Sequence, residues 1–430
     1  MPTIHLGYGK TRIPFDYDEK RFEILGRCEE LPALSDAEIG ERFDSPIDSK
    51  PLEDIVNPGE TVLIVVPDAT RRTASGQIVN LLVRRLIANG TMPHEIKIIF
   101  ATGIHRRVTE EEKREILTPF IAQRIRTLEH SARDLMQIAG LDSERFAYFG
   151  ETSGGIPIEL NRALTEFDRI ITVGGVTFHY FAGFTGGRKL ICPGLASEKT
   201  ISETHKLAFD FETKTRREGV GPGILKGNAV HEAFLEVAGK INVSFAVNTI
   251  VNDRGEAVEV FCGDFCASHE KACEFYAARH TVEIGEKKDL VIASCGGAPF
   301  DLNMIQAHKT LEAATRACRE GGTIVLLAEC ADGLGRKDFL KWFDAENSEK
   351  LAENLCEKYQ VNGQTAWSLL EKAERFNVHI LTSLPENETR LMRLQKARSP
   401  EEIFSKTDQK AKGFILPFGA KFLIRSQANF

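Results

Sequence analysis

Residues 61–71 read TVLIVVPDATR. The first six residues of this stretch form a short, largely β-branched run, which is typical of a strand in a largely parallel sheet. Similar runs alternate with helical patterns at 76–88 and 110–115, the second with Thr109 as its expected N-cap. The clearest runs are 61–66, 96–100, 169–173, 290–293, 323–327 and 379–381. This alternation predicts an α/β protein with largely parallel sheets.

Size and charge limit the possible functions. The 430 residues, 42% hydrophobic and 27% charged, are enough for one or two sizeable cores, and we expect two domains. The formal net charge is -7 and the isoelectric point is near 6.0. This balance gives no general attraction to nucleic acid or to an anionic membrane. An anionic ligand must therefore be held by local positive charge.

The amino terminus lacks a basic stretch followed by an apolar one, and no run reaches the roughly eighteen apolar residues of a membrane-spanning helix. The nine cysteines are odd in number and lie in apolar contexts, which suits reduced thiols better than a disulfide framework. We therefore expect a soluble, cytoplasmic protein without disulfides.

The domain boundary is expected near residue 270. Residues 241–251 alternate apolar and polar side chains before a turn, and 258–261 follows, which predicts an antiparallel hairpin. An N-terminal α/β domain would then span 1–270, and a C-terminal α/β domain would span 271–413. The strand-like segment 414–430 is expected to return to the first domain, because chain ends often lie side by side.

Four polar clusters follow directly after predicted strands. They are Asp68 with Arg71, His105, His179, and Gln306 with Lys309. Ligands of open parallel sheets bind beyond the carboxyl ends of the strands, so we expect the clusters to share one cleft. Since the fourth cluster lies in the second domain, the prediction is an active-site cleft between the domains.

The stretch 178–189 combines glycines with two cations. Its conformationally free positions are Gly183, Gly186 and Gly187. Glycines allow backbone N–H groups to approach a ligand closely, and the adjacent Arg188 and Lys189 suit a phosphate or a carboxylate. Leu190 follows Lys189 where a phosphate loop has Ser or Thr, so an ordinary nucleoside-triphosphate site is disfavoured.

Four motifs occur in one order along most of the chain. They are DATR at 68–71, ATGIHR at 101–106, HYFAGFTGGRK at 179–189 and QAHK at 306–309. Together with His205, they resemble the nickel-dependent lactate racemase family. The resemblance implies a nickel-pincer nucleotide, a pyridinium-3-thioamide-5-thiocarboxylic acid mononucleotide that holds nickel through carbon and sulfur. It also implies dedicated enzymes that make this cofactor.

The resemblance assigns the cofactor residues. Lys189 would carry the cofactor covalently, and His205 would supply the remaining nickel ligand, for which imidazole is suited. The glycine positions and Arg188 would accommodate the cofactor phosphate and ring. The implied function is a racemase or epimerase of a 2-hydroxy carboxylic acid.

The implied reaction moves a hydride from C2 of the substrate to the cofactor and back. A base must remove the hydroxyl proton as the hydride leaves, which gives a planar 2-keto acid. Inversion needs a base for each enantiomer, and the resemblance places His105 and His179 in these roles. Imidazole titrates near neutral pH and suits them.

The substrate-binding set implied by the resemblance comes from both predicted domains. Arg71 and Lys309 would hold the substrate carboxylate, and Gln306 would add a hydrogen bond. Asp68 would orient a neighbouring His or Arg.

The sequence also departs from the lactate enzymes of this family. Gln364 stands in place of a tryptophan, and Ile305 in place of an aromatic residue. Ala69 and Arg72 replace the His and Pro that flank the Thr-Arg pair. These changes alter the pocket, so the expected substrate is lactate or a different, larger 2-hydroxy acid.

Other interpretations stay open from the residues alone. A non-catalytic binder or sensor of an anionic metabolite could use the same cations, although two titratable histidines favour an enzyme. His205 lies in a polar helical stretch, where a histidine usually faces solvent, and Lys189 could be a surface lysine. A zinc site in the stretch 262–273 is disfavoured, because its Cys and His residues are not spaced as short Cys-x-x-Cys pairs. Its residues would be Cys262, Cys266, His269 and Cys273.

Overall fold

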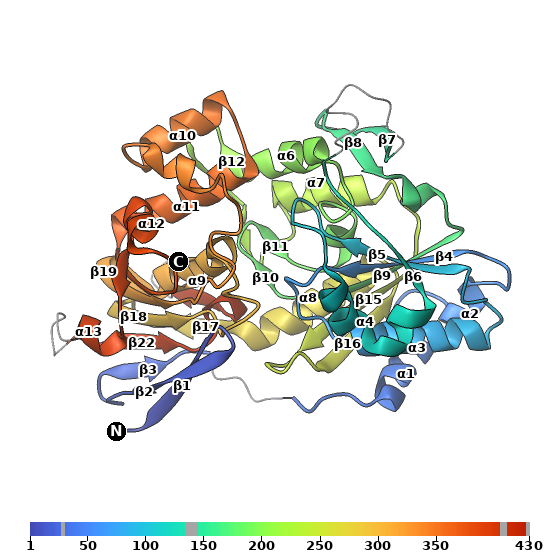
Figure 1. Cartoon of the computed structure of the whole chain (residues 1–430), viewed down its shortest axis with the longest axis horizontal. Coiled ribbons are helices and arrows are strands. Elements are labelled where there is room, and N and C mark those ends of the chain that lie inside the picture. Colours follow the sequence, from blue (N-terminus) through green and yellow to red (C-terminus); the bar gives the residue numbers. More distant parts are fainter. Residues whose placement is uncertain (27–30, 134–144, 405–410, 427–430) are drawn as a thin grey trace. The chain divides into compact units, whose positions relative to one another are not determined.

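The computed structural model describes residues 1–26, 31–133, 145–404 and 411–426. The chain forms two compact units, and neither is a single continuous stretch. Unit 1 comprises Met1–Glu29, Phe209–Glu218 and Ala277–Phe430, and unit 2 comprises Glu30–Ala208 and Gly219–Tyr276. The path of the chain through both units is coloured from blue to red in Figure 1.

Unit 2 is built on a six-stranded sheet with the strand order β16-β15-β9-β4-β5-β6. All neighbouring pairs are parallel except β15 with β16. The strands are β4 Val62–Pro67, β5 Ile96–Ala101, β6 Arg126–Leu128, β9 Arg169–Gly175, β15 Val243–Val251 and β16 Ala257–Gly263. Every residue of β4 is buried. Both faces of this strand are therefore packed against other side chains.

Helices, short helical turns and small ribbons complete unit 2. The helices and turns are α1 Asp36–Asp44, α2 Leu52–Ile55, α3 Ser75–Ala88, α4 Glu110–Arg124, η1 Arg162–Thr165, η2 Gly187–Leu190, α6 Glu198–Lys206, α7 Ala229–Ala238 and α8 Ala267–His280, whose last turn enters unit 1. The ribbons are β7 Phe146–Glu151 with β8 Pro157–Asn161, and β10 Phe178–His179 with β11 Ala182–Phe184 and β14 Gly221–Pro222.

The sequence predictions for this region agree with the structure. The predicted strands 61–66, 96–100 and 169–173 correspond to β4, β5 and β9, and the hairpin of β15 with β16 is antiparallel as expected. Thr109 caps α4: its side chain accepts the N–H of Glu112, whose carboxylate in turn accepts the N–H of Thr109. This reciprocal capping explains why the helix begins where it does.

Unit 1 contains a second six-stranded sheet, entirely parallel, with the order β21-β20-β19-β18-β22-β3. The strands are β3 Phe22–Ile24, β18 Lys288–Ser294, β19 Cys318–Leu327, β20 Asn377–Leu381, β21 Gln395–Ala397 and β22 Gly413–Leu416. Alternate residues of β18 belong to different cores: Val291 packs in one cluster and Ile292 in another. Both faces of this sheet are therefore covered.

The remaining elements of unit 1 surround this sheet. Its helices and turns are α9 Met304–Ala317, η3 Leu340–Asp344, α10 Ser348–Glu357, α11 Val361–Arg375, α12 Glu386–Leu391, α13 Pro400–Phe404 and η4 Gly419–Lys421. Its two-stranded pairs are β1 Thr3–Tyr8 with β2 Thr11–Asp16, β12 Phe209–Asp210 with β13 Thr215–Arg216, and β17 Thr281–Ile284 with β23 Leu423–Ser426.

The ends of the chain correct the predicted domain division. The boundary expected near residue 270 lies close to the observed one after Tyr276, but residues 1–29 belong to unit 1. The final strands also stay in unit 1: β22 pairs with β18 and β3, and β23 pairs with β17. Figure 1 shows the blue amino-terminal ribbon beside the red strand β22. The predicted first domain, 1–270 joined by 414–430, was therefore wrong in two ways. Its first 29 residues belong to unit 1, and so do the final strands β22 and β23.

Two further features bear on the sequence predictions. Within the described ranges, no helix combines the length and the apolar character needed to cross a membrane. Eight cysteines are free thiols in the structure, and the ninth, Cys28, lies outside the described residues.

The amino-terminal hairpin is tied to unit 1 by Asp301. Its Oδ2 atom accepts hydrogen bonds from the Gly9 N–H at 2.7 Å and from the Glu329 N–H at 3.2 Å. Since Asp301 is 1% exposed, Asp301→Ala should lower the free energy of unfolding by about 1–3 kcal/mol. Urea unfolding of the full chain measures this loss, with Asp332→Ala at an exposed position as the control. Equal stability of the two variants would contradict the assignment of the hairpin to unit 1.

Candidate active site

Asp68 and His105 meet at one edge of the unit 2 sheet. Asp68 follows β4, and His105 lies in the turn after β5, the strand that pairs with β4. His105 Nδ1 lies 2.7 Å from Asp68 Oδ2. An ionised carboxylate can only accept, so Nδ1–H donates and the neutral ring keeps its lone pair on Nε2. With this contact, Nε2 is the atom of the neutral His105 ring that can accept a proton.

Asp68 is held in its ionised form. Burial by itself raises the pKa of this carboxyl, but the charge and hydrogen bond of His105 and the charge of Arg71 outweigh it and lower the pKa to about 2. The other oxygen, Oδ1, accepts from the N–H and hydroxyl of Thr70, at 3.0 and 2.6 Å. Both oxygens are thus engaged by neighbouring residues, an arrangement that suits a side chain that orients His105 and Arg71.

Arg71 lies in the same loop and is half-buried. Its Nη1 donates to the carbonyl and hydroxyl oxygens of Thr70, both at 3.2 Å. Burial lowers the pKa of Arg71, and the charge of Asp68 opposes this shift. The guanidinium therefore stays charged at neutral pH and suits an anionic ligand.

His179 ends β10, directly after β9, and is buried. The Ala182 N–H donates to His179 Nδ1 at 3.3 Å, which places the proton of the neutral ring on Nε2. His179 therefore differs from His105, whose Nδ1 faces a carboxylate. The contacts at Nδ1 therefore favour different tautomers of the two histidines.

Aromatic rings connect His179 with His205 and Lys189. The Phe181 ring lies 4.4 Å from the His179 ring and 5.1 Å from the His205 ring, measured between centroids. Lys189 Nζ lies 5.6 Å from the centre of the same ring and 4.7 Å from that of Phe234. The Phe234 ring also contacts His205, at 5.4 Å. The structure thus brings the predicted lysine and nickel ligand to one pair of aromatic rings.

The imidazole of His205 is neutral, and its Nε2 atom carries a lone pair. It lies on α6, is buried, and its Nδ1 is 2.7 Å from the Ile201 carbonyl oxygen, so Nδ1–H donates and Nε2 carries the lone pair. Burial, then the charges of Lys189 and His105, lower the pKa of His205 to about 3. These charges also show that the three side chains are electrostatic neighbours. Because His205 is buried, the interpretation that it faces solvent was wrong.

The glycines of the predicted anion cradle have packing reasons of their own. Gly183 has a φ of 75°, and a Cβ atom there would lie 2.2 Å from the Ile224 carbonyl oxygen. A Cβ at Gly186 would lie 2.9 Å from Val176, and one at Gly187 would lie 2.6 Å from the His269 ring. The protein backbone itself therefore requires glycine at these positions, and their contact with a cofactor stays a prediction.

Arg188 points into the protein. Its Nη2 donates to the carbonyl oxygens of Ala182 at 2.6 Å and Phe184 at 3.0 Å, and the side chain is fully buried. Burial lowers the pKa of Arg188 to about 10, which leaves it charged at neutral pH. It thereby ties β11 to the turn that carries Lys189. Its direct contact with a cofactor also stays a prediction.

Gln306 and Lys309 belong to unit 1. Both lie on α9, in the first half of the helix that follows β18, and Lys309 Nζ donates to Gln306 Oε1 at 2.6 Å. Asn303 caps this helix by accepting the Gln306 N–H. That these two side chains share a cleft with the histidines of unit 2 stays a prediction.

Two aromatic residues next to the candidate site, Phe181 and Phe234, were not predicted from the sequence. Phe181 lies inside the motif at 179–189, but an aromatic residue at that position is also typical of an ordinary hydrophobic core. Phe234 lies on α7 and gave no signal beyond helical periodicity. Within the described ranges, no group of three or more His, Cys, Asp or Glu side chains is placed to hold a metal ion. His269 and Cys273 instead pack in α8.

The chain resembles known proteins along most of its length. Residues 8–216 match the lactate racemase N-terminal domain, and residues 284–413 match the lactate racemase C-terminal domain. A lactate racemase of Thermoanaerobacterium thermosaccharolyticum is 31% identical over 80% of this chain and 78% of its own length. The chain belongs to the lactate racemase family. It is therefore an isomerase of the racemase type.

Further relatives support the same family. A lactate racemase of Lactiplantibacillus plantarum is 32% identical over 79% of this chain and 77% of its own length. The solved lactate racemase apoprotein of T. thermosaccharolyticum superposes with a TM-score of 0.87 at 27% identity, covering 99% of this chain and 100% of that one. A Thermotoga maritima protein, with a TM-score of 0.72 at 21% identity over 93% of this chain and 100% of its own, shares the fold.

The depressed pKa of Asp68 gives a prediction on stability. An unfolded aspartate titrates near 3.8, so ionised Asp68 stabilises the folded protein above about pH 4, and this contribution is lost as the pH falls through about 2. Asp68→Asn should lower the free energy of unfolding by about 2 kcal/mol at pH 6 and by less at pH 3. Urea unfolding of both proteins at the two pH values measures this. A difference that grows at pH 3 would contradict the assignment.

Proposed function

We propose that the chain inverts C2 of a 2-hydroxy carboxylic acid, lactate or a larger relative, by reversible hydride transfer to a nickel-pincer nucleotide linked to Lys189. The observation that carries this proposal is the pairing of Lys189 with a buried, neutral His205 against the rings of Phe181 and Phe234. An amine for attachment and an imidazole lone pair for nickel lie against the same two rings.

The donor set supports a cofactor that brings its own ligands. A nickel ion held only by protein would need several side-chain ligands, and the described residues offer no group of three. A cofactor that holds nickel through carbon and sulfur needs only one imidazole, and His205 Nε2 suits it. The Nδ1 bond to the Ile201 carbonyl fixes the ring in the required tautomer. When bound, the cofactor would supply an electrophilic carbon that accepts and returns the C2 hydride.

The protein residues would manage the proton and the carboxylate. As the hydride leaves C2, His105 Nε2 takes the hydroxyl proton, and Asp68 stabilises the imidazolium that forms. The product of this half-reaction is a 2-keto acid, and return of both hydrogens on the opposite face inverts the centre. Arg71, Gln306 and Lys309 bind the carboxylate in this proposal. Arg188 and the glycines contribute by shaping the turn of Lys189.

His179 would serve the opposite enantiomer under a different constraint. To take a proton at Nε2, its ring proton must first move to Nδ1, and the long contact from the Ala182 N–H must give way. His105 needs no such rearrangement, because its Nδ1 already carries the proton. The two directions of the reaction should therefore differ in rate at the first half-reaction.

A larger, more polar substrate is part of the proposal. The first turns of α11 carry buried polar side chains, Asn362 and Gln364, and the Tyr359 hydroxyl donates to Gln364. Polar groups inside unit 1 suit a 2-hydroxy acid with further hydroxyl or carboxylate groups better than the methyl group of lactate.

The cofactor also implies partners and a place in the cell. We propose that separate maturation enzymes make the nucleotide, and that the protein works in the cytoplasm, where the eight free thiols would stay reduced.

Attachment at Lys189 can be tested directly. The full chain is produced together with maturation enzymes for the cofactor, and its intact mass and nickel content are measured beside those of Lys189→Ala. We expect a nickel-bearing adduct in the parent protein and none in the variant. A parent protein without adduct, in a host that loads a known family member, would contradict the proposed cofactor.

The two histidines can be separated by single turnovers. With loaded protein, formation of 2-keto acid is followed from each enantiomer of lactate and of larger polar 2-hydroxy acids. His105→Gln should slow the half-reaction of one enantiomer by about 10²–10⁴-fold, and His179→Gln that of the other. His5→Gln, at an exposed position without an assigned role, is the control.

Two results would count against these roles. Full inversion in either histidine variant would remove that residue from the reaction. Stabilisation of the loaded protein by a 2-hydroxy acid, without any inversion, would instead identify a non-catalytic binder.

A further inference from the structure

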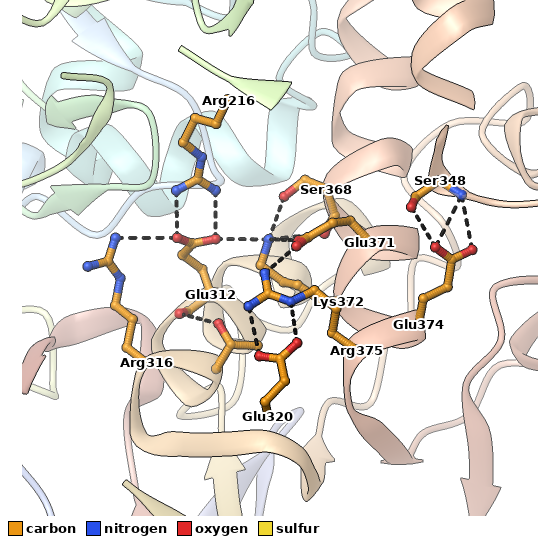
Figure 2. Close-up of polar contacts among 11 residues, drawn as sticks. Arg216, Glu312, Arg316, Glu320, Ser348, Ser368, Glu371, Lys372, Glu374 and Arg375 are labelled. Atoms are coloured by element: carbon orange, nitrogen blue, oxygen red, sulfur yellow. Dashed lines mark hydrogen bonds and ion pairs between the residues drawn. The ribbon is translucent and has the colours of Figure 1, made fainter. Parts of the chain in front are cut away.

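The buried ion group of unit 1 is paired within that unit. Arg216 donates from Nη1 to Glu312 Oε1 at 2.7 Å and from Nη2 to Oε2 at 2.8 Å. Figure 2 shows Arg216 and Lys372 converging on this carboxylate, with Lys372 Nζ 3.0 Å from Oε2. Both oxygens therefore have partners inside unit 1. In unit 2, by contrast, the buried side chain of Asn248 contacts the turn that carries Lys189.

Asn248 is a polar residue in the middle of a buried strand. It lies on β15, paired with Gly174 of β9 on one side and with Phe261 of β16 on the other, and it is 1% exposed. The side chain of its neighbour Val247 belongs to an apolar core cluster on the opposite face of the sheet. Burying a carboxamide costs free energy unless it is hydrogen-bonded. The partners of Asn248 therefore show what this residue contributes.

The turn at Gly187 takes its cap from Asn248. The helical turn η2 begins at Gly187, and the preceding Gly186 has no side chain with which to cap it. The buried Gly187 N–H donates to Asn248 Oδ1 at 3.1 Å. Lys189 lies in the same turn, and its N–H donates to the Gly186 carbonyl oxygen at 3.1 Å. Asn248 thus does for this turn what an N-cap side chain does for a helix.

A chain of hydrogen bonds fixes the orientation of the carboxamide. Asn248 Nδ2 donates to Ser268 Oγ at 3.1 Å, and Ser268 Oγ donates to the Asp264 carbonyl oxygen at 2.6 Å. Ser268 is the second residue of α8 and is fully buried. Because the Ser268 hydroxyl gives its only proton to Asp264, it can only accept from Asn248, which leaves Oδ1 facing Gly187.

The next residue of α8 reaches the same turn. His269 Nε2 lies 2.9 Å from the Thr185 carbonyl oxygen and 3.1 Å from Arg188 Nη1. These two residues stand directly before and after the glycine pair Gly186 and Gly187. Burial, then the charge of Arg188, lower the pKa of His269 to about 3, so the ring is neutral at neutral pH. Helix α8 therefore contacts the turn at both of its ends, while β15 binds its first N–H.

We propose that Asn248 is a positioning residue for Lys189. By accepting the Gly187 N–H, it fixes the turn from which the Lys189 side chain extends, and so keeps the amine against the rings of Phe181 and Phe234. Without this acceptor the Gly187 N–H would be buried and unpaired, and the turn would open to satisfy it. The inference rests on the proposed function, in which Lys189 carries the cofactor.

Four variants of the full chain separate this role from a simple loss of stability. Asn248→Leu keeps the approximate size of the side chain and removes the acceptor. Asn248→Asp keeps an oxygen for Gly187, and Ser268→Ala removes only the group that orients the carboxamide. Thr249→Val is the matched control on the same strand, because its buried hydroxyl donates to the Thr73 carbonyl oxygen at 2.9 Å instead. Urea unfolding confirms that each variant is folded.

The first measurement needs no cofactor. On the chain produced without maturation enzymes, mass spectrometry follows hydrogen exchange of the Gly187 amide and acylation of the Lys189 amine by acetic anhydride. Asn248→Leu should raise both rates about tenfold, the scale of one buried hydrogen bond, because the turn opens and the amine leaves its aromatic contacts. Asn248→Asp and Ser268→Ala should lie between this variant and the parent. Thr249→Val should match the parent within about twofold.

The second measurement follows attachment of the cofactor. In protein produced together with maturation enzymes, the fraction of chains with a nickel-bearing adduct should be lowest in Asn248→Leu and equal to that of the parent in Thr249→Val. The reason is that an amine no longer held in place reacts more slowly with a partner that must be bound in one orientation.

Equal exchange and acylation rates in Asn248→Leu and Thr249→Val would overturn the inference. Faster exchange at Gly187 with unchanged acylation and loading would overturn it as well. If Asn248→Leu does not fold, the comparison of Ser268→Ala with Thr249→Val decides in the same way. A parent protein without adduct, in a host that loads a known family member, would sink the proposed function instead. The exchange and acylation rates would then still decide whether Asn248 positions Lys189.

Discussion

The parallel sheet of unit 2, packed on both faces, is the constraint on which the candidate site depends. Parallel strands end at the same edge, so the residues that follow them must gather there. Pro67 of β4 is in register with Ala101 of β5, and the loops after these strands bring Asp68 against His105. The contact of Asp68 with His105 is therefore a consequence of the pairing of β4 with β5.

Burial then decides which side chains of the site carry charge. The low-dielectric interior disfavours charged groups unless they have partners. His205 has a backbone carbonyl and two aromatic rings as neighbours, and it is neutral. Asp68 has His105, Arg71 and Thr70, and it is ionised. The protein thus holds a buried, neutral imidazole at His205 and an ionised carboxylate at Asp68 that is paired with His105.

The path of the chain adds a second level of organisation. Residues 1–29, 209–218 and 277–430 form unit 1, so the chain passes between the units several times. The short middle segment is bound to unit 1 by an aromatic contact and by the pair of Arg216 with Glu312. Such buried pairs contribute little net stability, because desolvation opposes the attraction. Their value is in specificity, since a two-pronged contact accepts one geometry.

The sequence by itself determined the elements and the family. Short β-branched runs predicted β4, β5, β9 and β18, because strands that are covered on both faces are rich in apolar, β-branched residues. The spaced motifs, through their resemblance to the family, predicted roles for Lys189, His205, His105 and His179, and these roles stay predictions. Only the tertiary structure decided that residues 1–29 and 413–416 belong to unit 1, because their strand partners are remote in sequence. It also decided that Arg188 points inward and that Arg216 meets Glu312, since burial and long-range pairing have no local pattern.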